Sequence, residues 1–359
     1  MHHLSAFIDE PSALDAFAYR GNLYVLTFDG RLLTYDVQHL VRDLSDAHGQ
    51  TGLAVAYALF SSKGIGAGPE MKSASVALDQ VPSSMLRVKS SPSSSFQIPI
   101  EASALLDMRI FYNQIFLAAD IGTYRFRLDS AGKLSEGNLK PERMLAAPTE
   151  SLSTGMGAVA ASLGDEGLAV FLDVHAREPS RETRIESRSL RSSIGWGQAI
   201  NHPTHDSYEV LKSETIKDPS GKTMLVAVSR ANDQPHNGPE SRGSGTYAFW
   251  EFGRMLVGNH VGVASFGRLS SHGRRRAVTN SFDGKLPLSL GVTGNRCIVT
   301  ETRAHVTAAR GDRSVVIHHG EAASVRTFGG SQRYQRLIAS TVEGGLLLSA
   351  VFLSREDWV

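Results

Sequence analysis

An arginine-rich stretch is the clearest place in this sequence where the residue types suggest a specific chemistry, the binding of anionic groups. No acidic residue occurs from Phe252 to Phe282, while the same window holds several arginines. Arginine binds carboxylates and phosphates through paired N–H donors, and adjacent arginines are not buried without partners. The window therefore predicts a docking patch for an acidic protein surface or a nucleic-acid backbone. The alternative is a solvated loop that pairs with acidic residues of the N-terminal part. The predicted partner-binding arginines are Arg254, Arg268, Arg274, Arg275 and Arg276.

Trp196, which lies between Gly195 and Gly197, is added to this partner-binding set. Tryptophan and arginine often dominate the energy of protein interfaces. The flanking glycines leave two places for the ring, either packed between neighbouring sheets or exposed as an anchor. The phenylalanines of the arginine-rich window fit a core pattern better than an exposed stacking platform, which favours a protein partner over a nucleic acid.

His202, His205 and Asp206 form a His-x-x-His-Asp motif in a stretch that contains proline. Imidazole nitrogens and carboxylate oxygens are common ligands of zinc and iron. These three residues therefore give the alternative of a metal site, completed by a residue from elsewhere in the chain. A loop holds such ligands less rigidly than a helix does, and the motif often occurs by chance. The primary interpretation accordingly includes no metal and no cofactor.

Other motifs do not support catalysis. The sequence contains no Gly-x-Ser-x-Gly pentapeptide, and the nearest candidate nucleophile, Ser265, has different spacing and lies in a strand-like stretch. Gly64, Gly66 and Gly68 are followed neither by a clear helix nor by the Lys-Ser or Lys-Thr pair of a phosphate-binding loop. We therefore predict no catalytic residue.

The net charge of +1 hides an uneven distribution along the chain. The 359 residues include 37 lysines plus arginines and 36 aspartates plus glutamates. Residues 252–359 hold 14 basic and 7 acidic side chains, whereas residues 1–251 hold 23 basic and 29 acidic ones. Such asymmetry bears on partners rather than on fold. It predicts one acidic and one basic part of the molecule.

The rest of the composition is typical of a folded cytoplasmic protein. Hydrophobic residues make up 41% and charged residues 20% of the chain. The single cysteine, Cys297, cannot form an internal disulfide. No apolar run approaches the roughly 20 residues of a membrane helix, and Met1 to Glu10 lacks the basic and apolar segments of a secretory signal. We expect a cytoplasmic location and no membrane partner.

Short apolar runs between turn-forming residues predict a protein built mainly of β-strands. One helix is predicted from Gln38 to Ala47, because Leu40, Val41 and Leu44 fall on one side of it. The predicted strands are Ala16–Ala18, Leu23–Phe28, Arg31–Tyr35, Leu53–Phe60, Ile115–Ala119, Thr123–Leu128, Leu168–Val174, Met224–Val228, Thr246–Phe252, Cys297–Thr302, Ser314–His318 and Leu346–Leu353.

Weak internal repeats organise these strands. Leu14-Asp15 recurs 92 residues later as Leu106-Asp107, and Gly21-Asn22 recurs 273 residues later as Gly294-Asn295. Two further matches, at shifts of 145 and 323 residues, place Gly167-Leu168 on Asn22-Leu23 and Gly344 on Gly21. The four shifts lie near multiples of about 46–48 residues, within the length range of a propeller blade.

This periodicity resembles the β-propeller repeat superfamily in general. The resemblance implies an all-β fold, with residues 1–359 in a single propeller of about seven (six to eight) four-stranded blades. Because such a ring must close, we expect the Leu4–Ile8 segment to complete the last blade beside Leu346–Leu353. The chain lacks the repeated Gly-His and Trp-Asp pairs of WD40 proteins, the kelch double glycine and the sialidase box, so no single family follows.

Together these features favour a non-catalytic interaction module. It would bind a protein partner with an acidic surface through loops on one face, as a regulatory or scaffolding subunit of a larger assembly. One alternative is a propeller hydrolase or lyase with a metal or polar site at the central channel, since such sites draw residues from several blades. The other is a nucleic-acid-binding propeller that uses the arginine-rich C-terminal blades.

Overall fold

The computed structural model describes most of the chain and divides it into two compact units. The described residues are 1–61, 85–172, 174, 181–195, 198–205, 207–217, 223–230, 242–244, 246–251, 254–259, 263–266, 276–279 and 289–352. Unit 1 comprises Met1–Ile98, Ala131–Lys133 and Leu288–Val359, and unit 2 comprises Pro99–Ser130 and Leu134–Pro287. The described residues form seven sheets, each with at least four strands.

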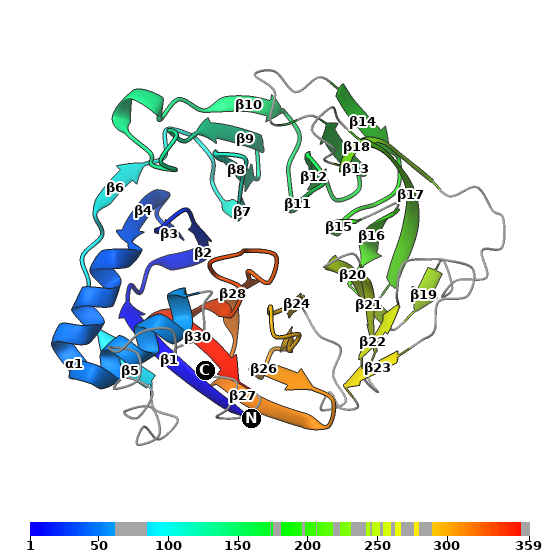
Figure 1. Ribbon diagram of the computed structural model, residues 1–359. Helices are drawn as coiled ribbons and strands as arrows, with labels where there is room; N and C mark the ends of the chain where they lie inside the picture. The colour runs from blue at the N-terminus through cyan, green and yellow to red at the C-terminus, as the bar shows by residue number, and fades with distance from the viewer. Residues whose placement is uncertain are drawn as a thin grey trace. The chain divides into compact units, whose positions relative to one another are not determined.

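Unit 1 contains three of these sheets, which Figure 1 colours blue to cyan and orange to red, and one long helix. The first sheet contains β2 (Ala13–Tyr19), β3 (Asn22–Thr27), β4 (Arg31–Asp36) and β6 (Ser94–Gln97). The second contains β28 (Ala322–Thr327), β29 (Leu337–Val342), β30 (Gly345–Phe352), β1 (His2–Asp9) and β5 (Met85–Val88). The third contains β24 (Ser289–Val292), β25 (Ile298–Glu301), β26 (His305–Arg310) and β27 (Arg313–His319). Strand β28 packs against both β2 and β24, so the three sheets meet through their first strands.

Unit 2 contains the other four sheets. The first contains β7 (Leu105–Phe111), β8 (Gln114–Ala119), β9 (Gly122–Arg127) and β10 (Glu142–Leu145), and the second contains β11 (Ser151–Gly155), β12 (Ala158–Ser162), β13 (Leu168–Leu172) and β14 (Arg181–Ile185). The third contains β15 (Arg191–Gly195), β16 (Gln198–Thr204), β17 (Ser207–Lys217), β18 (Thr223–Arg230) and β19 (Arg242–Ser244). The fourth contains β20 (Thr246–Glu251), β21 (Arg254–Asn259), β22 (Val263–Phe266) and β23 (Arg276–Thr279). A short 3-10 helix, η1 (Glu136–Asn138), precedes β10. Here too the first strands pack in succession, β7 on β11, β11 on β15 and β15 on β20.

Helix α1 (Val37–Phe60) confirms one prediction and corrects another. It contains the predicted helix Gln38–Ala47, and Asp36 caps it by accepting from the backbone N–H groups of Gln38 and His39. Leu53–Phe60, predicted as a strand, is the second half of this helix. An apolar run of eight residues does not distinguish a strand from a buried helix. Gly49, at φ +58°, bends the helix between its two halves.

The internal repeats are partly confirmed. The 92-residue shift aligns β2 with β7, and the 273-residue shift aligns the β2–β3 turn with the β24–β25 turn, which are equivalent positions. The shifts of 145 and 323 are wrong, because β13 and β30 are third strands of their sheets whereas β3 is a second strand. A shift of 92 residues is about twice the predicted repeat length, yet it spans only one sheet. The reason is that α1 and the residues up to β5 are inserted between β4 and β6.

Strand β1 joins the two ends of the chain within unit 1. It pairs with β30 in antiparallel register from His2 opposite Phe352 to Asp9 opposite Gly345. The predicted pairing of Leu4–Ile8 with Leu346–Leu353 is therefore present, with Leu4 opposite Ala350 and Ile8 opposite Leu346. The other edge of β1 pairs in parallel with β5, from Ser5 opposite Met85 to Ile8 opposite Val88. Helix α1 packs against β1, β5 and β30, so the insertion secures the N-terminal strand from outside.

We predict that Leu86→Ala destabilises unit 1 by about 2 kcal/mol, the lower end of the range for a buried leucine. Leu86 is 9% exposed and lies in the same apolar cluster as α1. Met85→Ala is the matched control, because Met85 is the neighbouring residue of β5 and is exposed. Thermal denaturation measures the loss, and hydrogen exchange should show faster opening of Ser5–Ile8. Equal effects of the two variants would contradict this role of β5.

Candidate functional site

The predicted arginine patch lies only partly within the described residues. Arg254 begins strand β21 and Arg276 begins strand β23. These are the second and fourth strands of one sheet, and they are not neighbours because β22 lies between them. The other predicted partner-binding residues, Arg268, Arg274, Arg275 and Trp196, lie outside the described residues. The patch therefore remains a prediction.

The His-x-x-His-Asp motif is split by the structure. His202 lies in β16, is 2% exposed, and its Nδ1 is 3.0 Å from the backbone oxygen of Ser207. His205 lies on the exposed turn after β16, with its Nδ1 3.0 Å from Nη2 of Arg191. Asp206 lies outside the described residues. Within the described part of the chain, no three His, Cys, Asp or Glu side chains gather in a way that could hold a metal ion.

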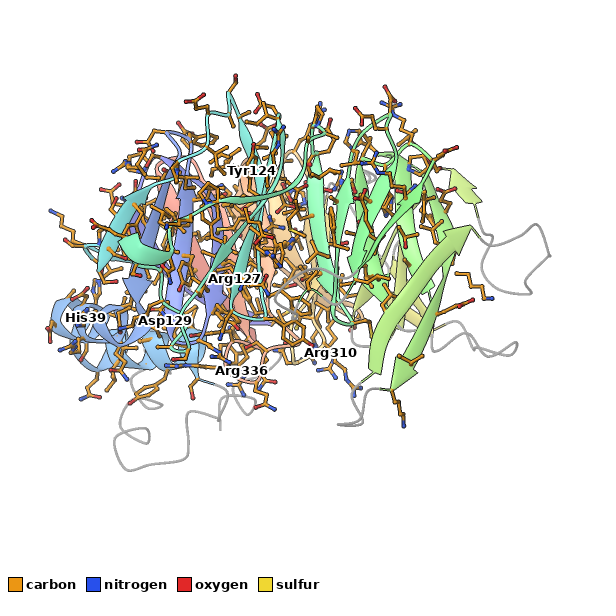
Figure 2. The ribbon with its side chains drawn as sticks, turned by 90° about the horizontal axis from the view of Figure 1, so that it is seen from above. His39, Tyr124, Arg127, Asp129, Arg310 and Arg336 are labelled. Carbon is orange, nitrogen blue, oxygen red and sulfur yellow. The ribbon has the colours of Figure 1, made fainter. Side chains whose placement is uncertain are left out.

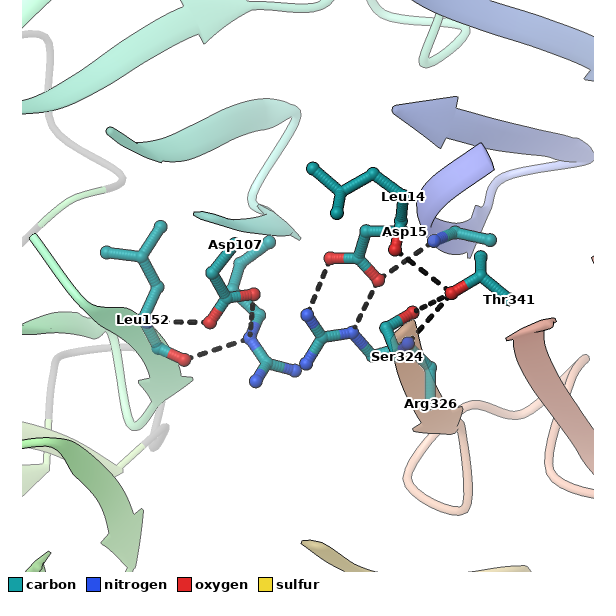
Figure 3. A network of polar contacts seen from close by, with 9 residues as sticks. Leu14, Asp15, Asp107, Leu152, Ser324, Arg326 and Thr341 are labelled. Carbon is teal, nitrogen blue, oxygen red and sulfur yellow. Dashed lines mark hydrogen bonds and ion pairs between the residues drawn. The ribbon is translucent and has the colours of Figure 1, made fainter. Parts of the chain in front are cut away.

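Two buried aspartates, at repeat-equivalent positions, anchor first strands to a neighbouring sheet (Figure 3). In each strand a β-bulge adds one residue, Leu14 before Asp15 in β2 and Leu106 before Asp107 in β7. A bulge changes the direction in which the next side chain points. The Leu-Asp repeat of the sequence therefore corresponds to a repeated structural device.

The partners of the two aspartates differ. Asp15, 2% exposed, accepts two hydrogen bonds from Arg326 of β28, at 2.9 Å to Nε and 2.6 Å to Nη2. Asp107, 5% exposed, accepts from the backbone N–H of Leu152 in β11 at 2.7 Å. Arg109 completes that second contact by donating to the Leu152 carbonyl at 2.9 Å. Both contacts fix the register between adjacent sheets of one unit.

The most distinctive surface feature of the described residues is a group of arginines at one end of unit 1. In an antiparallel sheet, the connection between the first and second strands and the connection between the third and fourth strands lie at the same end. The arginines lie in these connections. We call this group the basic loop cluster. Its members are Arg20 in the β2–β3 turn, Arg296 in the β24–β25 turn, Arg310 at the end of β26, and Arg333 and Arg336 between β28 and β29.

Hydrogen bonds between loops hold the three sheets together at this end. The N–H of Gly21 donates to the hydroxyl oxygen of Tyr334 at 2.7 Å, which links the first sheet to the second. The N–H of Gly294 donates to the Gln335 carbonyl, and Nδ2 of Asn295 donates to the Val351 carbonyl at 2.6 Å, which link the third sheet to the second. Figure 2 shows Arg310 and Arg336 at the same end as helix α1.

The loop Phe328–Arg336 is the centre of this end and has a fixed conformation. The hydroxyl of Ser331 accepts from the backbone N–H groups of Arg333 and Tyr334 at 3.2 and 3.0 Å. The Phe328 ring packs edge-on against Phe17 of β2, with centroids 5.2 Å apart. Tyr334 is 2% exposed, and burial raises the pKa of its hydroxyl. The loop is therefore anchored by buried rings while Arg333 stays exposed.

Aromatic rings also position the arginines. The guanidinium carbon of Arg20 lies 5.7 Å from the ring centroid of Tyr19, that of Arg333 lies 5.6 Å from Tyr334, and that of Arg336 lies 5.5 Å from Phe352. Cation–π contact of this kind restrains a long side chain. Nη1 of Arg310 donates to the Asn295 carbonyl at 3.0 Å.

Gly21 allows the first two sheets to approach each other. It has φ +85°, a conformation that L-residues with a side chain rarely adopt. A Cβ atom at this position would lie 3.2 Å from Nη1 of Arg333. Glycine therefore leaves room for that guanidinium beside the β2–β3 turn.

The turns at this end carry fewer carboxylates than those at the other end, and helix α1 adds Asp43 and Asp46 at this end. Asp36 is occupied in capping α1, and Asp312 is exposed in the β26–β27 turn. The opposite end of the same three sheets carries a set of carboxylates in its connections: Asp9, Glu10, Asp29, Glu321 and Glu343. One of these, Asp29, is paired with Arg31 at 2.7 Å.

Sequence reasoning missed the basic loop cluster because its arginines are single residues scattered from Arg20 to Arg336. Gly21-Asn22 and Gly294-Asn295 had been aligned as equivalent turns, and in both turns an arginine adjoins the Gly-Asn pair, Arg20 before it and Arg296 after it. That alignment was the one signal that could have joined Arg20 to Arg296. The excess of basic residues in 252–359 pointed to the same part of the chain without locating the site.

Comparison with solved structures identifies the fold. The chain is similar to the WD40 β-propeller domain of Doa1, with TM-score 0.53 and 9% identity over 99% of this chain and 97% of that one. It is likewise similar to the β-propeller domain of Myceliophteria thermophila Cps50 (Swd1), with TM-score 0.53 and 9% identity over 96% and 98%. For the Neurospora crassa Pan2 WD40 domain the TM-score is 0.50, with 10% identity over 97% and 88%. No protein-family model and no curated protein sequence matches the chain.

The chain therefore has an all-β propeller fold with four-stranded blades, as predicted, and it is WD40-like in fold despite lacking the WD40 sequence pairs. Among the described residues, no helix has both the length and the hydrophobicity needed to cross a membrane. At 9–10% identity these similarities establish the fold alone.

We predict that Asp15→Asn lowers the free energy of unfolding by about 3 kcal/mol, because Arg326 would stay largely buried without its counter-charge. The Arg326 side chain is 14% exposed. Asp29→Asn removes an exposed ion pair, at 40% and 54% exposure, and should cost less than about 1 kcal/mol. Urea denaturation of both variants gives the comparison. A similar small loss for both would show that the buried pair does not secure β2 to β28.

We predict that Tyr334→Phe destabilises the anchored loop by about 1–3 kcal/mol, because the Gly21 N–H loses its acceptor. The matched control is Tyr57→Phe, in a partly buried ring of α1. Thermal denaturation would report the global effect, and hydrogen exchange of the Gly21 amide would report the local one. An unchanged exchange rate at Gly21 would contradict the proposed role of the hydroxyl.

Proposed function

We propose that this chain is a non-catalytic propeller module that binds a protein partner through the basic loop cluster of unit 1. The observation that carries the proposal is the combination of a fixed loop with exposed charge. The Phe328–Arg336 backbone is anchored by Phe328, Ser331 and Tyr334, whereas Gln332 and Arg333 are exposed. A preformed loop loses little conformational entropy on binding.

The propeller fold supports this proposal in a general way. Loops on a rigid β-scaffold are a common place for binding groups, and each of the seven described sheets is proposed to be one blade of the ring. We further propose that the partner surface is acidic, since the cluster contributes arginines from all three sheets of unit 1. The predicted patch of Arg254, Arg268 and Arg274–Arg276 is proposed as a second basic region. A regulatory or scaffolding role in a larger cytoplasmic assembly is part of the same proposal.

We expect Arg333→Glu to reduce the capture of specific partners about tenfold, because charge reversal opposes an acidic surface. Immobilised wild-type protein and variant are exposed to extract of the native host, and the retained proteins are quantified by mass spectrometry. The matched control is Arg303→Glu, which makes the same charge change in the β25–β26 turn at the opposite end of unit 1.

A set of proteins lost with Arg333→Glu but retained with Arg303→Glu would support the basic loop cluster as the binding surface. Equal retention by wild type and both variants, with unchanged melting temperatures, would overturn the proposal.

A further inference from the structure

We propose that the basic loop cluster recognises an acidic stretch of polypeptide in extended form, bound through several carboxylates at once. This inference rests on the proposed function and names the chemistry of the partner. It is carried by the way in which the arginines are held, by the burial of two of their three aromatic neighbours, and by the distribution of the arginines over three sheets.

The exposed arginines of the cluster are suited to planar anions. In Arg20, Arg333 and Arg336 the guanidinium lies within 5.5 to 5.7 Å of a ring centroid. Arg20 and Arg333 are exposed, and an exposed arginine recognises a ligand through the N–H edge of its guanidinium. That edge matches the two oxygens of a carboxylate, which can accept two parallel hydrogen bonds.

The aromatic rings favour polypeptide over single-stranded nucleic acid. Nucleic-acid strands gain much of their affinity by stacking bases on exposed rings. In the cluster, Tyr334 is 2% and Phe352 is 1% exposed, and each ring is already in contact with an arginine. These two rings offer no surface for a base, and the third, Tyr19, is only partly exposed.

The distribution of the cluster favours an extended ligand with several charges. Arg20 comes from the first sheet, Arg333 and Arg336 from the second, and Arg296 and Arg310 from the third. The loops that carry them are joined by the hydrogen bonds of Gly21, Gly294 and Asn295. A single carboxylate could engage only one or two of these arginines, whereas a chain of carboxylates can follow the row of loops.

The test uses two labelled probes on the full chain, decaglutamate and decathymidylate, with fluorescence anisotropy as the readout. We expect saturable binding of decaglutamate at about 50 mM salt that weakens strongly at about 300 mM, as exposed charges are screened. Decathymidylate should bind more weakly. Arg333→Glu should weaken decaglutamate binding about tenfold, while Arg303→Glu should change it less than about twofold.

Arg333→Lys separates paired hydrogen bonding from net charge. Lysine keeps the charge but not the two parallel donors, so we expect binding to weaken about threefold. Wild-type affinity for Arg333→Lys, or tighter binding of decathymidylate than of decaglutamate, would overturn the inference. So would an absence of saturable decaglutamate binding.

The two proposals fail in distinguishable ways. If Arg333→Glu loses specific partners from extract but decaglutamate does not bind, the surface is a binding site and its partner is not an acidic stretch. If neither measurement responds to Arg333→Glu, the proposed function falls as well.

Discussion

The hydrogen-bonded pairing of β1 with β30 is the constraint on which unit 1 depends. It brings residues 2–9 against residues 345–352, so the N-terminal sheet of β2, β3, β4 and β6 is covalently continuous with a strand of the C-terminal sheet. The basic loop cluster has the same dependence, because Arg20 belongs to the N-terminal part and its other members belong to residues 296–336. The site forms only when the two ends of the chain have paired, and β5 and α1 stabilise that pairing on the other edge of β1.

The buried Asp15–Arg326 pair determines how β2 aligns with β28 in this assembly. Hydrophobic contact between first strands tolerates small sliding movements, whereas two hydrogen bonds from one guanidinium to one carboxylate do not. Desolvating these charges is expensive unless the geometry is good, so the pair favours one alignment of β2 against β28. That alignment sets the distance between the β2–β3 turn and the Phe328–Arg336 loop, which Gly21 and Tyr334 then bridge.

The sequence was sufficient for the propeller fold and for fewer than half of the strands, because apolar runs, turn residues and the Leu-Asp repeat are local signals. The pairing of β1 with β30 was predicted from the requirement that a propeller ring closes. It failed where the signal was ambiguous or non-local. The apolar run Leu53–Phe60 fits a strand as well as a buried helix, and the insertion after β4 doubled one repeat length and concealed the true spacing. The basic loop cluster is a non-local feature: its arginines share only their place in turns, and which turns lie at one end follows from strand order.

Strand order also changes the meaning of the charge asymmetry. Opposite charges on the two parts of the sequence predicted one acidic and one basic part of the molecule, yet within unit 1 the charges separate along the direction of the strands. The five arginines of the basic loop cluster lie in the connections at one end, and Asp9, Glu10, Glu321 and Glu343 lie in those at the other, together with Arg303. An electrostatic field directed along the strands orients an approaching charged molecule toward one end of the strands rather than toward the outer edges of the sheets. The loops at that end are also the ones fixed by Ser331 and Tyr334, so the charge that steers an acidic partner and the rigid surface that would hold it coincide.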